Sequence, residues 1–419
     1  MRHRFTGMLA ATLISLGAAR AEAQTFGLTD LGTLGGESSE AFFVTDSGVV
    51  GGYAQNAAGQ WRAVVWIDGD IADLGTLGGS ESYPMGFNQR GDVIGQSSLA
   101  GDTTAHGFFW SSDAGMVDLG TLGGDIVYPR DVNEHGVVVG HAYTASGAYH
   151  AFLWADGVMT DLGTLGGAAS AAEHVNDDGA VVGYAQRADG KFAGFLWKDG
   201  VMHELAAFGG GGSLATVPLL GENGVAVQFD RPNASPAVGA FTWDAGVYTS
   251  LGSLGGGYTQ PAAIGGAGEI VGYSLTTTGK QHPFLWQGGV MTDLGTLGGQ
   301  NGAAFLSAGG RIAGYAELAD QSVHAFLYAS GAMTDLGTLG GSYSYAQGLN
   351  ASGLVIGFSA TTDDAGEHTF AWKNGVLVDL GTFGGDYTYP AHLNGCGDIV
   401  GISYLGPDEA HHAFIARPF

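Results

Sequence analysis

The sequence predicts an all-β fold, a closed β-propeller of about nine four-stranded blades. The phrase Asp-Leu-Gly-Thr-Leu-Gly-Gly recurs along the 419 residues in steps of 42 to 46, and diverged copies occupy its place at 204–210 and 250–256. A steady period of this length indicates one supersecondary unit copied along the chain. Each period holds four short apolar runs separated by Gly, Asn and Asp, as four strands and their turns require. Four strands in about 40–45 residues are typical of a propeller blade.

Residues 1–23 precede the repeats and are typical of a secretory signal peptide. A basic start with Arg2 and Arg4 is followed by a largely apolar run at 5–19 and an A-x-A cleavage site that ends at Ala23. The run is shorter than the ~20 residues that a membrane-spanning helix needs. We therefore expect cleavage after Ala23, a secreted or periplasmic protein without a membrane span, and one propeller domain over residues 24–419.

One repeat shows the order of the strands. After the glycine pair at 123–124, apolar runs predict strands at 128–133, 137–141, 149–154 and 158–162. An Asn-x-x-Gly turn that begins at Asn133 joins the first two strands, and Asp156-Gly157 forms a hairpin turn between the last two. Both turns lie on one side of the sheet. The loop at 142–148 and the crossing after the glycine pair lie on the other side, where the copies vary.

The ends of the repeat region predict how the ring closes. Residues 26–34 are a fourth strand without the three that should precede it, and the last repeat stops after its third strand, at 412–415. Pairing these two strands completes the last blade with the N-terminal strand. It also leaves no open sheet edge with unpaired backbone groups.

Composition excludes some partners and sources of stability. Cleavage after residue 23 removes three arginines and one glutamate and changes the formal net charge from −26 to −28. This charge disfavours nucleic acid as a partner, because phosphate binding needs basic side chains. The single cysteine, Cys396, excludes an internal disulfide, so stability must come from burial and strand pairing.

The aspartate that opens each phrase and the histidine of each third strand are interpreted as structural. We expect each histidine to bond a backbone group beneath the next repeat, and each aspartate to bond turn amides of its own repeat. A ring of metal or calcium ligands is the alternative, although one histidine per repeat and isolated carboxylates are the wrong clustering for either ion. These residues are Asp30, Asp73, Asp118, Asp161, Asp293, Asp335, Asp379, His106, His150, His282, His324, His368 and His412.

The repeats resemble the extracellular HAF-repeat family of bacterial proteins, named for a His-Ala-Phe triplet. The triplet occurs at 150–152, 324–326 and 412–414, in register with Leu-Gly-Thr-Leu-Gly-Gly. The resemblance covers essentially all of residues 24–419 and implies secretion and a repeat architecture. The family has no established activity or catalytic residue to transfer.

Candidates for ligand binding lie on the variable side. Tyrosines of the crossing loops, with polar residues near the innermost strand, can bind a sugar, a peptide or a cationic group. The alternative is that Tyr-Pro stiffens a tight crossing and that the acidic side chains are only solvated. The candidates are Tyr83, Tyr128, Asp131, His174, Tyr345, Tyr389 and His392.

These patterns favour a secreted, monomeric scaffold that binds an unidentified extracellular ligand or protein and needs no cofactor. No catalytic residue is assigned, because the chain has no G-x-S-x-G, H-E-x-x-H or phosphate-loop motif. A carbohydrate-active hydrolase or lyase with paired acids on the variable side is the first alternative. A purely structural extracellular protein, with or without calcium, is the second. A unique site is best sought in the diverged fifth copy, around 208–233.

Overall fold

The chain folds into antiparallel sheets. A computed structural model describes residues 26–205, 218–229, 239–406 and 410–418, which form 36 strands and one short 3-10 helix, η1 (Thr362–Asp364). The predicted signal peptide at 1–23 lies outside the described residues, as does much of the 208–233 segment. Within the described ranges, no helix is long and apolar enough to span a bilayer. The predicted all-β class is confirmed.

Consecutive strands form one sheet after another in the first half of the chain. These sheets are β2 (Gly35–Val44), β3 (Val50–Asn56), β4 (Trp61–Ile67) and β5 (Asp70–Asp73); β6 (Gly78–Phe87), β7 (Val93–Leu99), β8 (Ala105–Ser111) and β9 (Gly115–Asp118); β10 (Gly123–Val132), β11 (Val138–Thr144), β12 (Tyr149–Ala155) and β13 (Val158–Gly163); β14 (Gly166–Val175), β15 (Val181–Arg187), β16 (Phe192–Lys198) and β17 (Val201–Leu205); β18 (Leu219–Leu220), β19 (Ala226–Phe229), β20 (Ala240–Asp244) and β21 (Val247–Ser250).

The second half repeats the pattern, and a parallel bridge between Val323 and Tyr343 links two of its four-stranded groups into one eight-stranded sheet. The strands are β22 (Gly255–Ile264), β23 (Ile270–Thr276), β24 (Gln281–Gln287) and β25 (Val290–Asp293); β26 (Gly298–Ala308), β27 (Arg311–Leu318), β28 (Val323–Ala329) and β29 (Ala332–Asp335); β30 (Gly340–Leu349), β31 (Val355–Thr361), β32 (Glu367–Lys373) and β33 (Val376–Asp379); β34 (Thr388–Leu393), β35 (Ile399–Tyr404) and β36 (His411–Pro418).

The last sheet takes its fourth strand from the other end of the chain. β1 (Phe26–Asp30) pairs antiparallel with β36, from Phe26 opposite Pro418 to Asp30 opposite Phe414. The strand order of this sheet is β1-β36-β35-β34. The pairing predicted for the N-terminal strand is therefore present.

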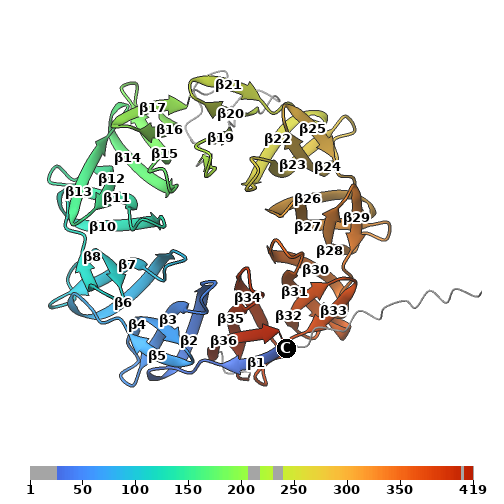
Figure 1. Ribbon diagram of the computed structural model, residues 1–419, viewed down its shortest axis with the longest axis horizontal. Helices are drawn as coiled ribbons and strands as arrows, with labels where there is room; N and C mark the ends of the chain where they lie inside the picture. The colour runs from blue at the N-terminus through green and yellow to red at the C-terminus, as the bar shows by residue number, and fades with distance from the viewer. Residues whose placement is uncertain (1–25, 206–217, 230–238, 407–409, 419) are drawn as a thin grey trace, which may run out of the picture.

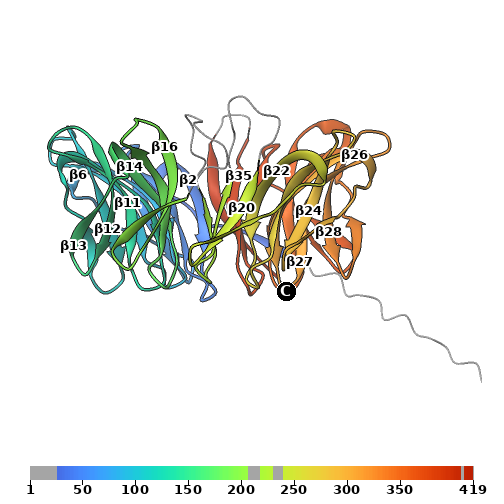
Figure 2. The same cartoon turned by 90° about the horizontal axis from the view of Figure 1, so that it is seen from above.

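The sheets stand around a centre that no described strand crosses, with the first strand of each innermost and the last at the periphery (Figure 1). Seen edge-on, they form one layer (Figure 2). Seven of the innermost strands begin at the glycine pair, as at Gly123, and so start earlier than the sequence predicted, whereas β18 and β34 begin at Leu219 and Thr388. Tyr83, Tyr128, Tyr345 and Tyr389 therefore lie inside strands, and their assignment to crossing loops is corrected.

A phenylalanine of the third strand and a glycine of the second strand form the centre of a typical sheet. Phe152 is fully buried and lies opposite Gly140 in the register. A Cβ atom on Gly140 would lie 2.1 Å from the carbonyl oxygen of Tyr128 and 3.0 Å from the ring of Phe152. The recurring strand glycine is thus needed for close backbone approach, as its position predicted.

Buried asparagines tie neighbouring sheets together at the Asn-x-x-Gly turns. The Asn133 Oδ1 atom accepts hydrogen bonds from the amides of His135 and Val137 in its own turn. Its Nδ2 atom donates to the carbonyl oxygen of Asn176 in the next sheet, at 3.0 Å. The same donation recurs from Asn88 to Asn133, Asn176 to Gly221, Asn350 to Asn394, and Asn394 to Thr45. The last of these bonds joins the final sheet to the first.

Serine and threonine hydroxyls of the innermost strands make a second set of bonds between sheets. The Ser170 Oγ atom accepts the amide of Ala151 from the preceding sheet at 2.8 Å and donates to the Gly163 carbonyl. Ser82, Ser344 and Thr388 accept an amide of the preceding sheet in the same way. Ser39 accepts the amide of Ala413 at 2.9 Å. The last and first sheets are therefore joined by the same kind of bond as sheets that follow one another in the chain.

Replacing Asn133 by alanine should lower the free energy of unfolding by about 1–3 kcal/mol, because the Asn176 carbonyl and two turn amides lose their buried partner. Urea denaturation measures the change. Asn223→Ala is the control, since the exposed Asn223 side chain bonds one amide of its own turn, that of Val225. Equal losses in the two variants would contradict a special role for the bonds between sheets.

Candidate functional site

A β-bulge in each long innermost strand adds one side chain at the inner edge of the sheets. The register of β10 against β11 shifts between Pro129 and Asp131, so Arg130 has no partner opposite it. Equivalent shifts in the other sheets leave one residue each without a partner on the second strand: Phe42, Met85, Glu173, Ala262, Phe305, Gln347 and Ala391. Phe42 and Phe305 are 36% and 39% exposed, although phenylalanine is normally buried.

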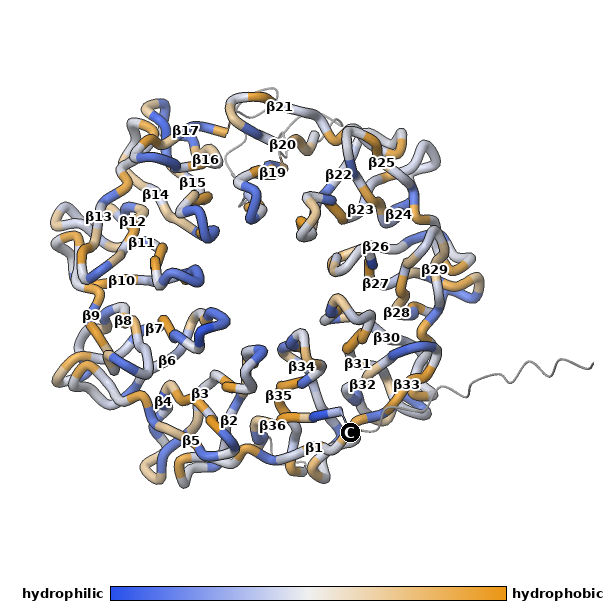
Figure 3. The backbone as a smooth tube through the Cα atoms, viewed as in Figure 1, coloured by the Kyte–Doolittle hydropathy of each residue, from blue (hydrophilic) through white to orange (hydrophobic). Residues whose placement is uncertain are grey.

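The inner edge is polar on one part of the ring and aromatic on another. The inner ends of the sheets that contain β10, β14 and β19 are hydrophilic, and those of β26 and β34 are more hydrophobic (Figure 3). Arg130 and Glu173 occupy the bulges of β10 and β14. Phe305 and Phe42 occupy those of β26 and β2. The bulge position therefore differs in chemistry from one sheet to the next.

A chain of aromatic contacts, here called the inner aromatic rim, runs along the second part. Ring centroids lie 5.0–6.3 Å apart from Phe305 through Tyr315, Tyr345 and Phe358 to Tyr389, Tyr387 and Tyr404, and again from Phe42 through Tyr53 to Tyr83. Tyr404 contacts His411, which bonds Glu40 at 2.8 Å beside Tyr53 and so connects the two runs. Tyr83, Tyr345 and Tyr389, predicted as ligand residues, all belong to this rim.

Carboxylates accept hydrogen bonds from tyrosines of the rim and from Tyr343, whose ring lies beside that of Tyr345 at 5.9 Å. Both Tyr343 and Tyr389 donate to Glu367, and Tyr83 donates to Glu81 at 3.0 Å. Burial and the bond to Glu81 raise the pKa of Tyr83 to about 12, and the bond to Glu367 does the same for Tyr343. These tyrosines are therefore neutral hydrogen-bond donors at physiological pH. The rim combines exposed aromatic surface with paired hydroxyl and carboxylate groups.

Tyr128 lies apart from this chain. It stacks on His141, with ring centroids 5.0 Å apart. Burial and the neighbouring Arg130 lower the pKa of His141 to about 4, so the ring is neutral above that pH. Tyr128 therefore belongs to the polar part of the inner edge.

Asp131 and His174 are brought together, and His392 lies elsewhere. The carboxylate of Asp131 accepts the amide of Val175 in the next sheet at 3.0 Å and lies 3.5 Å from the His174 Nδ1 atom. The hydrogen bond with Asp131 raises the pKa of His174. His392 accepts the amide of Val44 at 3.4 Å, and burial lowers its pKa. Each of these contacts connects two sheets near the centre.

The histidines and aspartates interpreted as structural meet one another at the outer edge. The Nδ1 atom of His150 lies 2.8 Å from the Asp161 carboxylate, which also accepts the turn amide of Gly163. His106, His282, His324, His368 and His412 pair in the same way with Asp118, Asp293, Asp335, Asp379 and Asp30. The sequence predicted a backbone partner for the histidines, and this is corrected. Asp73 instead lies 3.8 Å from Arg62, which replaces the histidine.

No group of three or more metal-ligating side chains occurs within the described ranges. Each outer histidine faces one carboxylate of its own sheet, which for His412 is Asp30 of β1. The described side chains therefore provide no multidentate site of the kind that zinc or calcium needs.

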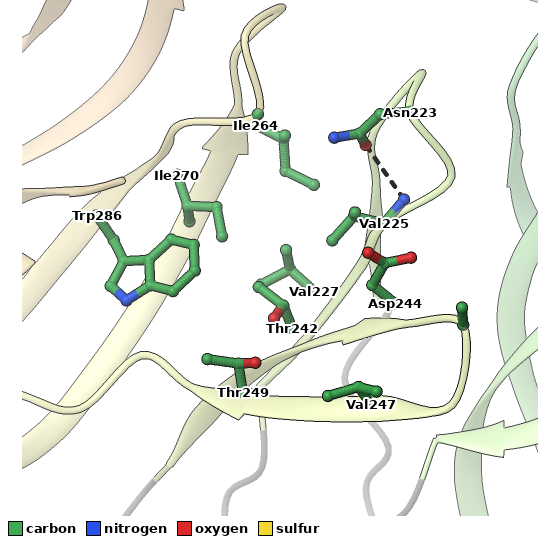
Figure 4. A pocket seen from close by; sticks show the side chains of 12 residues that line it. Asn223, Val225, Val227, Thr242, Asp244, Val247, Thr249, Ile264, Ile270 and Trp286 are labelled. Carbon is green, nitrogen blue, oxygen red and sulfur yellow. Dashed lines mark hydrogen bonds between the residues drawn. The ribbon is translucent and has the colours of Figure 1, made fainter. Parts of the chain in front are cut away.

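A crevice opens between the β18–β21 and β22–β25 sheets, with a volume of about 460 Å³. Val225 and Val227 line one side, and Ile264, Ile270 and Trp286 line the other (Figure 4). Thr242, Thr249, Asn223 and Asp244 supply polar groups. Asp131 and His174 line a smaller cavity of about 280 Å³ with Glu222 and Leu220.

The segment that the sequence pointed to, 208–233, contains Asn223, Val225 and Val227 of this crevice, but sequence reasoning did not single out Thr242 or Trp286. The available signal was Thr242, where the other repeats have an apolar residue. The difficulty was that Trp286 and Ile270 belong to the sixth repeat, which has no unusual residue at those positions.

Comparisons with known proteins identify no family for this chain. No family model and no curated protein matches it, so the resemblance to HAF repeats stays a prediction. Solved structures that it resembles include TolB from Acinetobacter baumannii (14% identity, TM-score 0.33, 61% of this chain and 62% of that chain). Others are the β-propeller domain of the Trilobed protease from Pyrococcus furiosus (11%, 0.38, 72% and 98%) and a puromycin-hydrolyzing peptidase from Mycobacterium tuberculosis (14%, 0.41, 88% and 58%). The chain spans about three fifths of TolB and of the peptidase. TM-scores this low carry no argument about its activity.

The contact between Asp131 and His174 predicts a pH-dependent stability. Because the folded-state pKa of His174 is raised, this stabilisation is present below the ordinary histidine pKa of about 6.5 and is lost as pH rises through the raised value. Asp131→Asn keeps an acceptor for the Val175 amide but removes the charge. Its Tm deficit relative to wild type should therefore be larger at pH 6 than at pH 9.

Differential scanning fluorimetry at the two pH values measures this deficit. Asp189→Asn is the control, since the partner of Asp189 is Arg187, which does not titrate in this range. An Asp131→Asn deficit that is the same at both pH values would contradict the assignment.

Proposed function

We propose that this protein is a secreted scaffold that binds a neutral glycan chain along the inner aromatic rim. The observation that supports the proposal is the run of aromatic rings over five consecutive sheets, from Phe305 on β26 to Tyr83 on β6. Tyr83 and Phe42 are 38% and 36% exposed. Such rings offer flat apolar faces of the kind on which sugar rings pack.

Polar groups beside the rings match the chemistry of sugar hydroxyls. Glu367, Glu81 and Glu40 are acceptors, and the hydroxyl oxygens of Tyr83 and Tyr343 can also accept, because their single protons are donated to Glu81 and Glu367. An uncharged ligand rich in hydroxyl groups supplies the donors that these acceptors need. Fixed aromatic surface with a few oriented polar groups is the usual composition of a binding site.

Glycan binding should depend on Tyr345 and Tyr389. Replacing each by alanine should weaken binding by about 1 kcal/mol, roughly fivefold, because one stacking face is lost. A glycan array identifies the ligand, and calorimetry with the best-bound glycan gives the affinity of each variant.

Tyr184→Ala is the matched control. Tyr184 packs on Phe192 in the β14–β17 sheet, outside the rim, so its removal should leave the affinity unchanged. A folded protein that binds no neutral glycan would contradict the proposal. Release of shorter sugars from the bound glycan would instead support the hydrolase or lyase alternative.

We also propose that the scaffold is a closed propeller of nine blades. Support comes from β1 beside β36, and from the Ser39 and Asn394 bonds, which join the last sheet to the first as other sheets are joined. The four-stranded groups number nine when the eight-stranded sheet is divided at its single parallel bridge.

Closure makes β1 essential for stability. Deleting residues 1–31 should lower Tm by more than about 10 °C, because β36 loses its edge partner and the core residues around Phe414 lose the apolar cover of Phe26 and Leu28. Deleting residues 1–23 alone is the control and should leave Tm unchanged. Equal Tm values for the two truncated proteins would exclude closure through β1.

A further inference from the structure

The crevice beside the β18–β21 sheet lies where the asparagine bonds between sheets are interrupted. Asn176 still donates to the Gly221 carbonyl, but glycines, Gly221 and Gly265, occupy the asparagine position in this sheet and the next. Asn223 fills the space beside Gly221, where a Cβ atom would lie 2.6 Å from its Oδ1 atom. Among the described residues, no hydrogen bond joins the 221–224 turn to the β22–β25 sheet.

The third strand differs at the same boundary, because Thr242 places a hydroxyl where the other sheets have an apolar side chain. Thr242 lies opposite Val227, and the residues at this position in the other sheets are apolar: Val65, Phe109, Leu153, Leu196, Leu285, Leu327, Ala371 and Ile415. At the boundary of the second and third sheets, Phe109 packs on Trp154 with ring centroids 5.4 Å apart. Trp286 is the counterpart of Trp154, and it faces the much smaller Thr242.

The crevice has the size and composition of a small-molecule site. Its volume of about 460 Å³ falls within the roughly 300–1,000 Å³ of typical ligand pockets. Valine and isoleucine side chains and the Trp286 ring form apolar walls, and Asn223, Thr242 and Thr249 supply neutral polar groups (Figure 4). An occupant therefore needs a compact apolar body.

The single carboxylate of the crevice, that of Asp244, indicates that the ligand carries a positive charge. Asp244 is the one ionisable residue among those lining it, and it is exposed. Its carboxylate has no hydrogen bond or ion pair with the described residues. The indole Nε1 atom of Trp286 is buried and also has no partner within the described ranges. A cationic group over the apolar floor would pair with the Asp244 carboxylate.

We propose that this crevice binds a small amphipathic amine, with its apolar body between the two sheets and its ammonium group at Asp244. The site is separate from the inner aromatic rim, so it stands or falls independently of glycan binding. It uses the one sheet boundary at which Thr242 replaces an apolar residue.

Tryptamine and indole-3-ethanol are suitable probes, because they share an indole body and differ in an ammonium or a hydroxyl group. Isothermal titration calorimetry with the folded full-length protein should give at least tenfold tighter binding of tryptamine. Asp244→Asn should abolish this preference. Asp113→Asn, at the exposed β8–β9 turn, should leave it unchanged.

Variants of Thr242 test the location. Thr242→Phe restores the ring found at Phe109 and fills the crevice, so it should abolish binding of both probes and raise Tm. Thr242→Ser keeps the volume and should bind as wild type does. Should Thr242→Phe not fold, the Asp244→Asn and Thr242→Ser results still decide the question.

Either of two results would overturn the proposal. One is equal affinity of the wild-type protein for the two probes, or no binding of tryptamine. The other is unchanged tryptamine binding in folded Thr242→Phe or in Asp244→Asn.

Discussion

The architecture depends on hydrogen bonds between neighbouring sheets, and at five boundaries a buried asparagine makes that bond. Asn133 shapes its own turn with Oδ1 and reaches the carbonyl of Asn176 with Nδ2. A four-stranded sheet cannot bury both faces alone, so each must be held against two neighbours. The asparagine fixes that placement at the inner end, and the serine hydroxyls, as at Ser170, fix it further out. Together they set the spacing in which the apolar side chains pack.

This bond is missing beside the crevice. Gly221 and Gly265 lack the asparagine side chain, and Thr242 replaces an apolar side chain at the same boundary. At the following boundary the buried Glu269 substitutes for an asparagine, because its carboxylate accepts the Ser307 hydroxyl at 2.7 Å. That second boundary has a cavity of only about 130 Å³. The crevice of about 460 Å³ thus lies where both the polar bond and the apolar side chain are missing.

The bulges let residues at the inner edge vary independently of the strand pairing in the rest of the sheet. A bulged residue has no partner in the register, so Phe42, Arg130 and Phe305 can differ without disturbing the pairing of their neighbours. Tyr345 and Tyr389 occupy the same register position in their sheets, and each contacts an aromatic ring of the neighbouring sheet. Repetition therefore supplies a rigid frame, and the variable positions at its inner edge supply the chemistry.

The repeated phrase, the turn motifs and the two ends of the chain were enough to determine an all-β fold of four-stranded units in which β1 completes the last sheet. They were enough because period, glycine conformation and strand alternation are local properties. Contacts between repeats were not accessible: the sequence showed Asn133 as a turn residue, and its bond to Asn176 needs the sheets in place. Likewise, Tyr345 and Tyr389 were identifiable as candidates, but their contacts through Phe358 depend on tertiary spacing. Only the tertiary structure decided that Thr242 faces Trp286 across the crevice, because one wall of the crevice comes from the fifth repeat and the other from the sixth.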